Sequence, residues 1–501
     1  MIMTATAGAT STPVPEHTAQ TYKWYADGKW REAVNGKAFE DFEPYTGRLY
    51  ARAADCGAEE AKIAIKAAND AFPAWADTPP VEKARLFLKA AEIVRRRRSE
   101  IAEILARETG STIPFSMFQQ DLVATALEQA ANWVYLPKGE VLQSNLPNTH
   151  SIGVRRPLGV VASFTPWNGA SILSWRAVLN PLAAGCTVVV KPSEFAPISA
   201  GITVAEIAEE AGFPPGVINV VTHAPGGAAA IADEFFASDD VRCINLIGGV
   251  KTARVLAERA GRTLKRTVLE LGGYNPMIVL DDVDVDYAVR MATFGSFFHQ
   301  GQICLNTRKI IVQRGIYDEF VRKLVERTKT LVPGDPLDPR TNIGPLITEA
   351  AVKLVDERVM EAVSLGASLL TGGTHDGLVY QPTILTDVPY EATASNEETF
   401  GPLVIVEAVD TPEDAVAVAN RVGYGLTSSI LARDTYKALE LAPKILHGIV
   451  NVNSPTINDE IHAPMGGVRD SGWGRTGPDS LADFTDVIWI NATSSERQFP
   501  F

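Results

Sequence analysis

Short apolar runs and amphipathic segments alternate along the middle of the chain. Between residues 160 and 271, runs with the length of buried strands are separated by segments with helical periodicity. The predicted strands are 160–164, 187–190, 216–221, 241–247 and 267–269, and the predicted helices are 199–211, 226–237 and 251–260. This alternation predicts a parallel sheet covered by helices on both faces, and such sheets bind ligands at the carboxyl ends of their strands.

A second region with the same rhythm extends from Tyr274 to about Val450. Its predicted strands are 276–280, 308–313 and 403–407, and its predicted helices are 285–298 and 317–330. Ahead of both regions, residues 79–108 carry apolar side chains on one helical face and predict a single helix that ends at Gly110. The fold class is therefore α/β, with two separate units.

Two further segments match neither unit. Residues 132–154 and 486–501 alternate between polar and apolar side chains and are predicted to be strands that pair outside the two units. Residues 1–20 are rich in Thr, Ala, Ser and Pro and are predicted to be a disordered lead-in. They have no apolar signal core, and no stretch of the chain is long and apolar enough to span a membrane, so we expect a soluble cytoplasmic protein.

Charge and cysteine content exclude several classes of function. The 46 Lys and Arg against 60 Asp and Glu give a net charge of −14, which disfavours nucleic acids and anionic membranes as partners. The four cysteines are too few and too scattered for a disulfide framework, and no cluster of His and Cys suggests a metal site.

Two local motifs are better explained by structure than by function. The run Arg95–Arg98 could bind phosphate, but the neighbouring Glu92 and Glu100 favour a solvated helix face. The string Gly472-Trp-Gly-Arg-Thr-Gly477 matches a dinucleotide fingerprint by letter, yet Arg469-Asp470 precede it and Pro478 follows it. The fingerprint requires a strand before it and a helix after it, so we interpret this string as a glycine-rich turn.

Cys304 and Glu270 are the first candidates for chemistry. Cys304 ends the string Phe297-Phe-His-Gln-Gly-Gln-Ile-Cys304, after a helix and a glycine-containing turn, where backbone amides could lower the pKa of the thiol. Cys186 and Cys243 lie in or beside apolar strands and are expected to be inert. Glu270 stands among apolar residues at a strand end, so its pKa should be raised and it could act as a general base.

Three further polar groups follow predicted strands or turns. The Asn168 amide, in Phe164-Thr-Pro-Trp-Asn168, could donate to a developing oxyanion. Lys191 and Glu194, in Val190-Lys-Pro-Ser-Glu194, could hold the hydroxyls of a ribose. Glu398 opens the string Glu398-Thr-Phe-Gly-Pro402. Each group alone could be an ordinary loop residue, but their occurrence together in one α/β chain is informative.

Together these strings resemble the NAD(P)-dependent aldehyde dehydrogenase superfamily over residues 24–490. The resemblance implies a Rossmann-type cofactor domain at 21–131 and 155–271, an α/β catalytic domain at 272–450 and a small β oligomerisation element at 132–154 and 486–501. Residues 451–485 would form a loop on the substrate side that returns to the cofactor domain. A homodimer or homotetramer is implied, because the two outer strands would extend the sheet of a partner.

The resemblance also implies roles for individual residues. Cys304 would be the nucleophile, Asn168 would stabilise the oxyanion, and Glu270 would activate the water that hydrolyses a thioester. Glu194 at the ribose would repel a 2′-phosphate, so NAD is expected over NADP. The cofactor-binding residues would be Lys191, Glu194, Glu398, Phe400, Gly248, Gly249, Trp167 and Thr165.

The chain departs from the family pattern at Gly249, at Ala253, where a glycine is common, and at Tyr274. Gly249 stands where relatives often have a serine near the cofactor pyrophosphate, so the following helix would bind this group with backbone amides alone. Tyr274 stands where Lys or Asn is common, and the sequence offers no explanation for it.

Other details resemble the vanillin, benzaldehyde and salicylaldehyde dehydrogenase branch. These are Thr222–Pro225, Trp167–Ala170, Arg176 and Asn458–Gly467. Gly169 stands where many relatives that accept aliphatic aldehydes carry an aromatic ring, and its small size would admit a planar aromatic substrate. The predicted tunnel residues are Gly169, Leu173, Trp175, Ile303 and His462.

Several alternatives stay open at this point. An aliphatic aldehyde or a semialdehyde would use the same mechanism. A CoA-acylating enzyme is disfavoured by Glu270, and a cysteine hydrolase that pairs Cys304 with His299 lacks an evident orienting Asp or Asn. A catalytically silent cofactor-binding or structural relative would be free to lose Cys304 or Glu270, and both are present.

Overall fold

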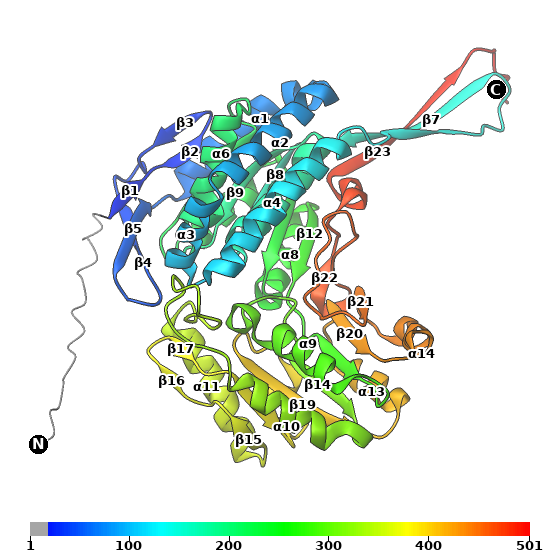
Figure 1. Cartoon of the computed structure of the whole chain (residues 1–501). Coiled ribbons are helices and arrows are strands. Elements are labelled where there is room, and N and C mark those ends of the chain that lie inside the picture. Colours follow the sequence, from blue (N-terminus) through cyan, green and yellow to red (C-terminus); the bar gives the residue numbers. More distant parts are fainter. Residues whose placement is uncertain (1–18) are drawn as a thin grey trace, which may run out of the picture.

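An eight-stranded sheet forms the centre of the first lobe in the computed structural model, which describes residues 19–501 (Figure 1). Its order is β22 (Gly472–Trp473), β12 (Arg266–Leu271), β11 (Val241–Gly248), β8 (Val160–Thr165), β9 (Thr187–Pro192), β10 (Ile218–Val220), β2 (Trp24–Ala26) and β3 (Lys29–Arg31). The five strands from β12 to β10 run parallel, and the outer strands pair antiparallel. Their carboxyl ends therefore meet at one edge.

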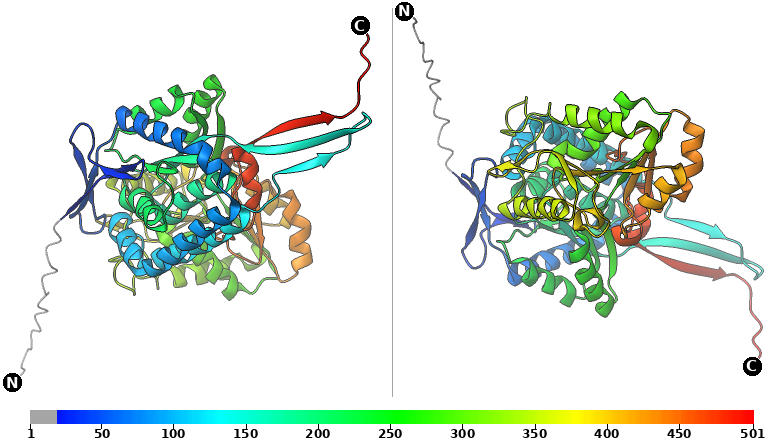
Figure 2. Two further views of the ribbon diagram at one scale, coloured as in Figure 1. Left: turned by 90° about the horizontal axis from the view of Figure 1, so that it is seen from above. Right: turned by 90° about the horizontal axis from the view of Figure 1, so that it is seen from below.

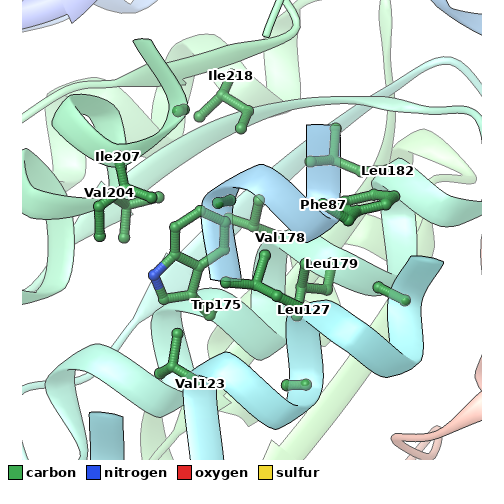
Figure 3. Close-up of a cluster of buried hydrophobic side chains, with 14 of the residues drawn as sticks. Phe87, Val123, Leu127, Trp175, Val178, Leu179, Leu182, Val204, Ile207 and Ile218 are labelled. Atoms are coloured by element: carbon green, nitrogen blue, oxygen red, sulfur yellow. The ribbon is translucent and has the colours of Figure 1, made fainter. Parts of the chain in front are cut away.

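Helices bury both faces of this sheet. They are α1 (Ala58–Asp77), α2 (Pro80–Arg96), α3 (Arg98–Thr109), α4 (Ile113–Trp133), α5 (Ala170–Ala184), α6 (Thr203–Ala211), α7 (Ala228–Ala237) and α8 (Val250–Thr263). Successive side chains of a strand point to opposite faces, so Val188 and Val190 pack with α2, α4 and α5, whereas Val189 packs with α1 and α7. Figure 3 shows the first of these two cores, in which Trp175 of α5 lies among aliphatic side chains.

A seven-stranded sheet forms the second lobe. Its order is β15 (Ser368–Thr371), β18 (Thr383–Thr386), β19 (Leu403–Val409), β14 (Lys309–Gln313), β13 (Pro276–Val279), β20 (Thr427–Leu431) and β21 (Ile449–Val452), parallel except for β15. Its helices are α9 (Val285–Phe297), α10 (Tyr317–Thr328), α11 (Glu349–Ser364), the short α12 (Thr393–Asn396), α13 (Pro412–Ala419) and α14 (Thr435–Leu441). The α/β fold with two units is confirmed.

A three-stranded antiparallel arm projects from the first lobe (Figures 1 and 2). It consists of β6 (Gly139–Leu142), β7 (Thr149–Pro157) and β23 (Thr485–Thr493), with Thr485 opposite Pro157 and Thr493 opposite Thr149. The two segments predicted to pair outside the main sheets, 132–154 and 486–501, therefore contribute to one sheet. A second small sheet near the amino end has the order β1 (Gln20–Tyr22), β5 (Leu49–Ala54) and β4 (Ala38–Phe42).

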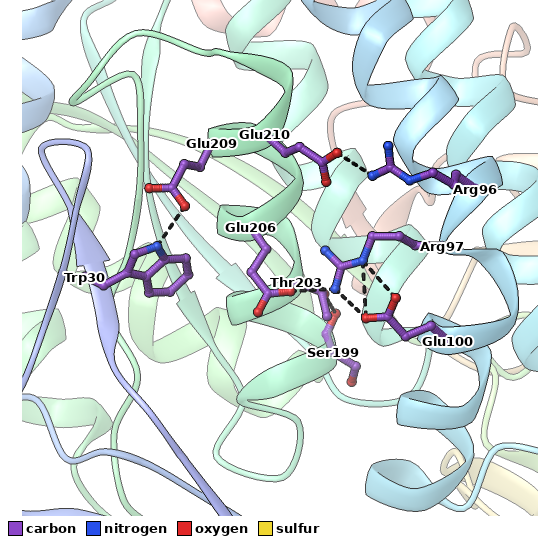
Figure 4. A network of polar contacts seen from close by, with 9 residues as sticks. All are labelled: Trp30, Arg96, Arg97, Glu100, Ser199, Thr203, Glu206, Glu209 and Glu210. Carbon is purple, nitrogen blue, oxygen red and sulfur yellow. Dashed lines mark hydrogen bonds and ion pairs between the residues drawn. The ribbon is translucent and has the colours of Figure 1, made fainter.

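The single helix predicted over residues 79–108 is wrong, because the chain breaks between α2 and α3 at Arg97. Arg97 donates to Glu206 of α6 and to Glu100, so tertiary ion pairing holds the break. Each arginine from Arg95 to Arg98 is paired with a carboxylate, and Figure 4 shows the contacts of Arg96 and Arg97. Arg95 and Arg96 are exposed, as expected of a solvated helix face, whereas Arg97 and Arg98 are half-buried. The run pairs with carboxylates of α4 and α6, which a solvated face does not require.

Gly110 and the glycine-rich string at 472–477 adopt the structures predicted for them. Gly110 ends α3 in the left-handed conformation, as expected. The glycine-rich string at 472–477 begins with the two-residue strand β22, and a 3₁₀ helix, Pro478–Phe484, follows it; the α-helix that a fingerprint requires is not there. The predicted lead-in, residues 1–20, lies almost wholly outside the described residues. Within residues 19–501, no helix is both long and apolar enough to cross a membrane.

Candidate active site

A cavity of about 290 Å³ lies where the two lobes meet. The first lobe contributes the loop after β8 and the ends of β11 and β12, and the second lobe contributes the Cys304 loop and the loop before β19. The lining residues are Pro166, Trp167, Asn168, Leu173, Ile247, Gly248, Gly249, Glu270, Leu271, Gly272, Cys304, Glu398, Phe400, Leu426, Met465 and Gly466. All three predicted catalytic residues therefore face one cavity.

Strand register aligns the candidate residues of the first lobe along one edge. Glu270 of β12 pairs with Ile247 of β11, and Phe164 of β8 pairs with Lys191 of β9. Because these strands are parallel, their ends present Glu270, Gly248, Asn168 and Lys191 in succession along the sheet edge. This is the arrangement that an extended ligand lying across the strand ends requires.

The Cys304 loop is held by buried amide side chains. Gln300 Nε2 donates to Gly110 O at 3.0 Å and to Pro345 O at 2.9 Å, and Ile347 N donates to Gln302 Oε1 at 3.1 Å. Asn306 Oδ1 accepts from Ile303 N at 2.6 Å, and Asn275 Nδ2 donates to Cys304 O at 2.6 Å. These contacts fix the backbone on both sides of the thiol.

The backbone of the Cys304 loop has residues with positive φ angles and a close approach at a glycine. His299 and Gln300 have positive φ angles of 52° and 43°, which are uncommon for residues other than glycine. At Gly301, with φ of 72°, a Cβ would collide with the backbone at Gly401, so only glycine lets the two loops approach. Close approach of the two loops brings Cys304 near Glu398 and Phe400.

Asn168 is positioned by the same loop. It is buried, lines the cavity, and donates from Nδ2 to Gln302 O at 3.0 Å. A side-chain amide carries two N–H donors, so one remains for a ligand in the cavity. This free donor matches the requirement of an oxyanion site.

Burial dominates the titration of the two reactive candidates. It raises the pKa of Glu270 to about 7, against the opposing charge of Arg176, as expected for a carboxyl group among apolar residues. It also raises the pKa of the Cys304 thiol to about 12, helped by the Glu398 carboxylate. The expected lowering of the thiol pKa by backbone amides is therefore not found, and deprotonation of Cys304 requires a base.

The other three cysteines behave as buried core residues. Cys56, Cys186 and Cys243 are buried, and burial raises the thiol pKa of each. The expectation that Cys186 and Cys243 are inert agrees with this environment. Only Cys304 is partly accessible, and all four cysteines are free.

The residues predicted to hold a cofactor fit a dinucleotide. Gly248 and Gly249 line the cavity at the amino end of the 14-residue helix α8, where unpaired backbone N–H groups favour a phosphate. A Cβ at Gly249 would meet nothing within 4 Å, so the absent serine leaves open space. Trp167 and Phe400 form adjacent cavity walls, with ring centroids 5.7 Å apart.

Two buried oxygens near this edge have no hydrogen-bond partner. They are Glu398 Oε1 and Thr165 Oγ1. Glu398 lies against Gly272, where any Cβ would collide with the carboxylate. Unsatisfied buried oxygens are costly unless a ligand pairs with them, so both suit a group that binds through hydroxyls or amides. Lys191 is buried at the end of β9, and Glu194 is partly exposed three residues later.

The five residues predicted to form a substrate tunnel lie in different surroundings in the structure. Leu173 lines the cavity. Gly169 is the N-cap of α5 and is not among the lining residues, and a Cβ at Gly169 would contact the side chain of Leu173. Trp175 is fully buried among the aliphatic side chains of the first lobe's core and does not line the cavity (Figure 3). Ile303 is not among the lining residues, but it packs in one apolar cluster with Leu426 and Met465, which do line the cavity. His462 is exposed beside Glu460.

Several functional neighbours were missed by the sequence analysis. Leu426 and Met465 line the cavity, although Met465 stands within the string 458–467 already noted. Arg308 donates to Ile303 O at 3.1 Å and to Gly401 O at 3.2 Å, and so joins the Cys304 loop to the Glu398 loop. In the sequence, Arg308 is recognisable only as a basic residue four positions after Cys304.

The packing of Tyr274 explains why a tyrosine occupies this position. Its ring is fully buried, and its hydroxyl donates to Ala394 O at 2.7 Å. Ala394 lies in α12, just before the Glu398 loop. Tyr274 therefore supports the segment that carries Glu398.

Two α/β lobes that place a thiol, a buried carboxyl group and an amide donor around one shared cavity form the arrangement expected of an enzyme active site. The profile of the Aldehyde dehydrogenase family matches residues 30–490, and the chain belongs to this family. It is an aldehyde dehydrogenase, and the resemblance noted in the sequence is confirmed.

Named relatives and solved structures agree with this assignment. The chain is 39% identical to a vanillin dehydrogenase of Pseudomonas fluorescens, over 93% of this chain and 97% of that protein. It is 36% identical to an NADP-dependent succinate-semialdehyde dehydrogenase of Escherichia coli, over 93% of this chain and 96% of that protein. The crystal structure of a Pseudomonas putida G7 salicylaldehyde dehydrogenase, complexed with salicylaldehyde, superposes with a TM-score of 0.94 at 35% identity, covering 96% and 100% of the two chains.

Proposed function

We propose that this enzyme oxidises an aromatic aldehyde to the carboxylic acid with NAD. The observation that carries the proposal is the meeting of Cys304, Glu270 and Asn168 at one cavity whose other walls are mostly apolar. Relatives named for vanillin and salicylaldehyde support the aromatic class of substrate.

In the proposed mechanism, Cys304 Sγ adds to the aldehyde carbon. The carbonyl oxygen becomes an oxyanion, which the free N–H of Asn168 and the backbone N–H of Cys304 would stabilise. Since burial raises the thiol pKa, Glu270 is the base that removes the proton from Cys304. When bound, NAD accepts the hydride that leaves the thiohemiacetal carbon.

The product of that step is a thioester on Cys304. Glu270 first releases to solvent the proton that it took from Cys304, and it then takes a proton from a water molecule whose oxygen attacks the thioester carbon. The C–S bond breaks, the acid is released, and Glu270 returns its proton to the thiolate, so that the Cys304 thiol is restored. Two easier steps thus replace one difficult oxidation.

For the cofactor, we propose that Lys191 and Glu194 hold the adenosine ribose and that Glu398 holds the nicotinamide ribose. Gly248 and Gly249 would face the pyrophosphate, with Trp167, Phe400 and Thr165 beside the nicotinamide end. The Glu194 carboxylate favours NAD, because it accepts hydrogen bonds from ribose hydroxyls and repels a 2′-phosphate.

A semialdehyde is the second candidate substrate, because a semialdehyde dehydrogenase is among the relatives. Such a substrate carries a second carboxylate, which a basic side chain in the cavity would bind. The lining contains no Lys or Arg, and the nearby Arg176 is paired with Asp459. The apolar walls at Leu173, Leu426 and Met465 favour a neutral ring instead.

The test is formation of NADH or NADPH by the purified protein. Benzaldehyde, vanillin and salicylaldehyde are compared with acetaldehyde, hexanal and succinate semialdehyde, each with NAD and with NADP. We expect turnover of the aromatic aldehydes with NAD and none in Cys304→Ala. Preference for succinate semialdehyde or for hexanal would overturn the aromatic assignment and keep the mechanism, whereas activity of Cys304→Ala would overturn the mechanism.

We further propose that the arm joins copies of this chain in a homodimer or homotetramer. Val141, Val487 and Trp489 on the arm are exposed, although they are large and apolar. Exposed apolar strands with free edge groups are suited to pairing with a second chain.

A further inference from the structure

Lys191 and His223 form a buried hydrogen bond at the edge of the first sheet. The distance from Lys191 Nζ to His223 Nε2 is 2.7 Å, and both residues are buried. Lys191 lies at the end of β9, and His223 follows the adjacent strand β10. The pair thus lies at the carboxyl edge where ligands of such sheets bind.

The direction of this hydrogen bond follows from the neighbours of the imidazole ring. His223 Nδ1 lies 2.8 Å from Ala224 O, and a carbonyl oxygen only accepts, so Nδ1 carries the proton. Nε2 of the neutral ring is therefore the acceptor for the Lys191 ammonium group. Asp55 Oδ1 accepts from Ala224 N at 3.0 Å, so the turn that carries the ring is itself anchored.

The charges around the pair keep the ring neutral. Burial and the Lys191 charge lower the pKa of His223, while the Ala224 carbonyl and the carboxylates of Glu194 and Asp55 act in the opposite direction. Burial lowers the pKa of Lys191 to about 8, and Glu194 opposes this shift. A neutral acceptor beside a buried ammonium group is a stable combination near neutral pH.

We propose that His223 is a cofactor-positioning residue that acts through Lys191. An ammonium group has three N–H donors, and His223 takes one of them. The other two then have a fixed direction, which Glu194 and the hydroxyls of the adenosine ribose would share. This inference rests on the proposed use of NAD.

The role predicts a specific pattern of effects. Without an acceptor at residue 223, the flexible Lys191 side chain loses its fixed orientation, and the enzyme must order it when the cofactor binds. The affinity for the adenosine half of the cofactor then falls. The chemistry at Cys304, which lies on the other lobe, is unaffected once the cofactor is bound.

A pair of variants separates the acceptor from the volume of the ring. His223→Gln places an amide oxygen near the position of Nε2, whereas His223→Leu has a similar size and no acceptor. We expect His223→Leu to bind NAD and ADP-ribose about tenfold more weakly, in the range of one lost buried hydrogen bond, with kcat at saturating NAD within about twofold. His223→Gln should stay within about twofold of the wild type in both measurements.

Binding is measured by calorimetry at pH 7.5, and the melting temperature of each unliganded variant reports on folding. In a Lys191→Met background, the change from His223 to Leu should have no further effect on NAD binding, because the residue through which it acts is gone. If His223→Leu is poorly folded, His223→Asn, which is too short to reach Lys191, takes its place.

The outcomes are distinguishable. Wild-type affinity in His223→Leu, equal weakening in His223→Gln, or an undiminished effect in the Lys191→Met background would each overturn the role of His223. Failure of the wild-type protein to bind NAD at all would overturn the proposed function together with this inference.

Discussion

Burial sets the protonation states of the two side chains that would carry the chemistry. With a pKa near 12, the Cys304 thiol is protonated in the free enzyme at neutral pH, whereas Glu270, with a pKa near 7, is partly ionised. A base whose pKa is close to the working pH is the efficient choice for proton transfer. Burial of the Glu270 carboxyl group costs stability, but it also raises the pKa of this group to the value that its proposed role as a base requires.

The pH dependence of turnover tests this role. Glu270 acts as a base only when ionised, so kcat of the wild type should rise as pH increases through about 7. Glu270→Gln should lower kcat by about 10²–10⁴-fold and lose this rise. Steady-state NADH formation between pH 5.5 and 9 gives both profiles.

The exposed Glu357 of α11 provides a control, because Glu357→Gln should leave the profile unchanged. Removing a carboxyl group whose ionised form is disfavoured by burial should also raise the melting temperature above pH 7. An unchanged pH profile in Glu270→Gln would exclude Glu270 as the base.

At the scale of elements, loops far apart in sequence are held together around the cavity. Arg176 of α5 forms a buried ion pair with Asp459 and also contacts Met465 Sδ at 3.5 Å. The contact ties helix α5, whose Leu173 lines the cavity, to the segment that supplies Met465. This segment has no regular secondary structure from 453 to 468, so side-chain contacts must fix it.

Breaking the ion pair between Arg176 and Asp459 should lower the free energy of unfolding. Asp459→Leu leaves the Arg176 charge buried without a partner, and the expected loss of stability is about 3–5 kcal/mol. The double variant Arg176→Met/Asp459→Leu should lose less, because no unpaired charge remains. Denaturant unfolding of the three proteins measures the difference.

Lys66→Ala is the control, because its ion pair with Asp70 is exposed and should contribute at most about 1 kcal/mol. A single variant no less stable than the double variant would show that the pair does not hold this segment.

Hydrophobic periodicity predicted the strands and helices correctly where burial alone determines the pattern of apolar residues. The central strands β8 and β9 are mainly apolar and are buried along their whole length, as parallel strands covered on both faces must be. Trp175 was misplaced because α5 is buried on all sides, so its pattern shows no single inward face. The break at Arg97 and the anchoring of Gln300 by Gly110 depend on partners distant in sequence, which no local pattern reveals.

At the scale of the whole molecule, the projecting arm has no hydrophobic core of its own. Its three strands are mostly exposed, and small isolated sheets are marginal in water. Association with another chain would supply the missing burial.

Charge on the arm should therefore weaken assembly. The double variant Val487→Lys/Trp489→Lys is expected to shift the wild-type oligomer towards a single chain of 54.0 kDa, because two exposed apolar side chains that a partner would bury become charges. Light scattering coupled to size exclusion measures the mass. Glu357→Lys, on the exposed face of α11, is the control, and an unchanged mass of the double variant would place the interface elsewhere.

Strand β22 lies near the end of the chain, so the strand edge beside Glu270 is completed late in synthesis. It pairs directly with β12, with Gly472 opposite Glu270, but residues 272–471 are made between the two strands. At about 5–20 residues per second, this delay lasts on the order of tens of seconds. A growing chain on the ribosome therefore holds the Glu270 edge of its sheet open until nearly the last residues emerge. The enzyme would become competent only at the close of translation, with the reactive thiol and its base brought together in a chain that is already almost complete.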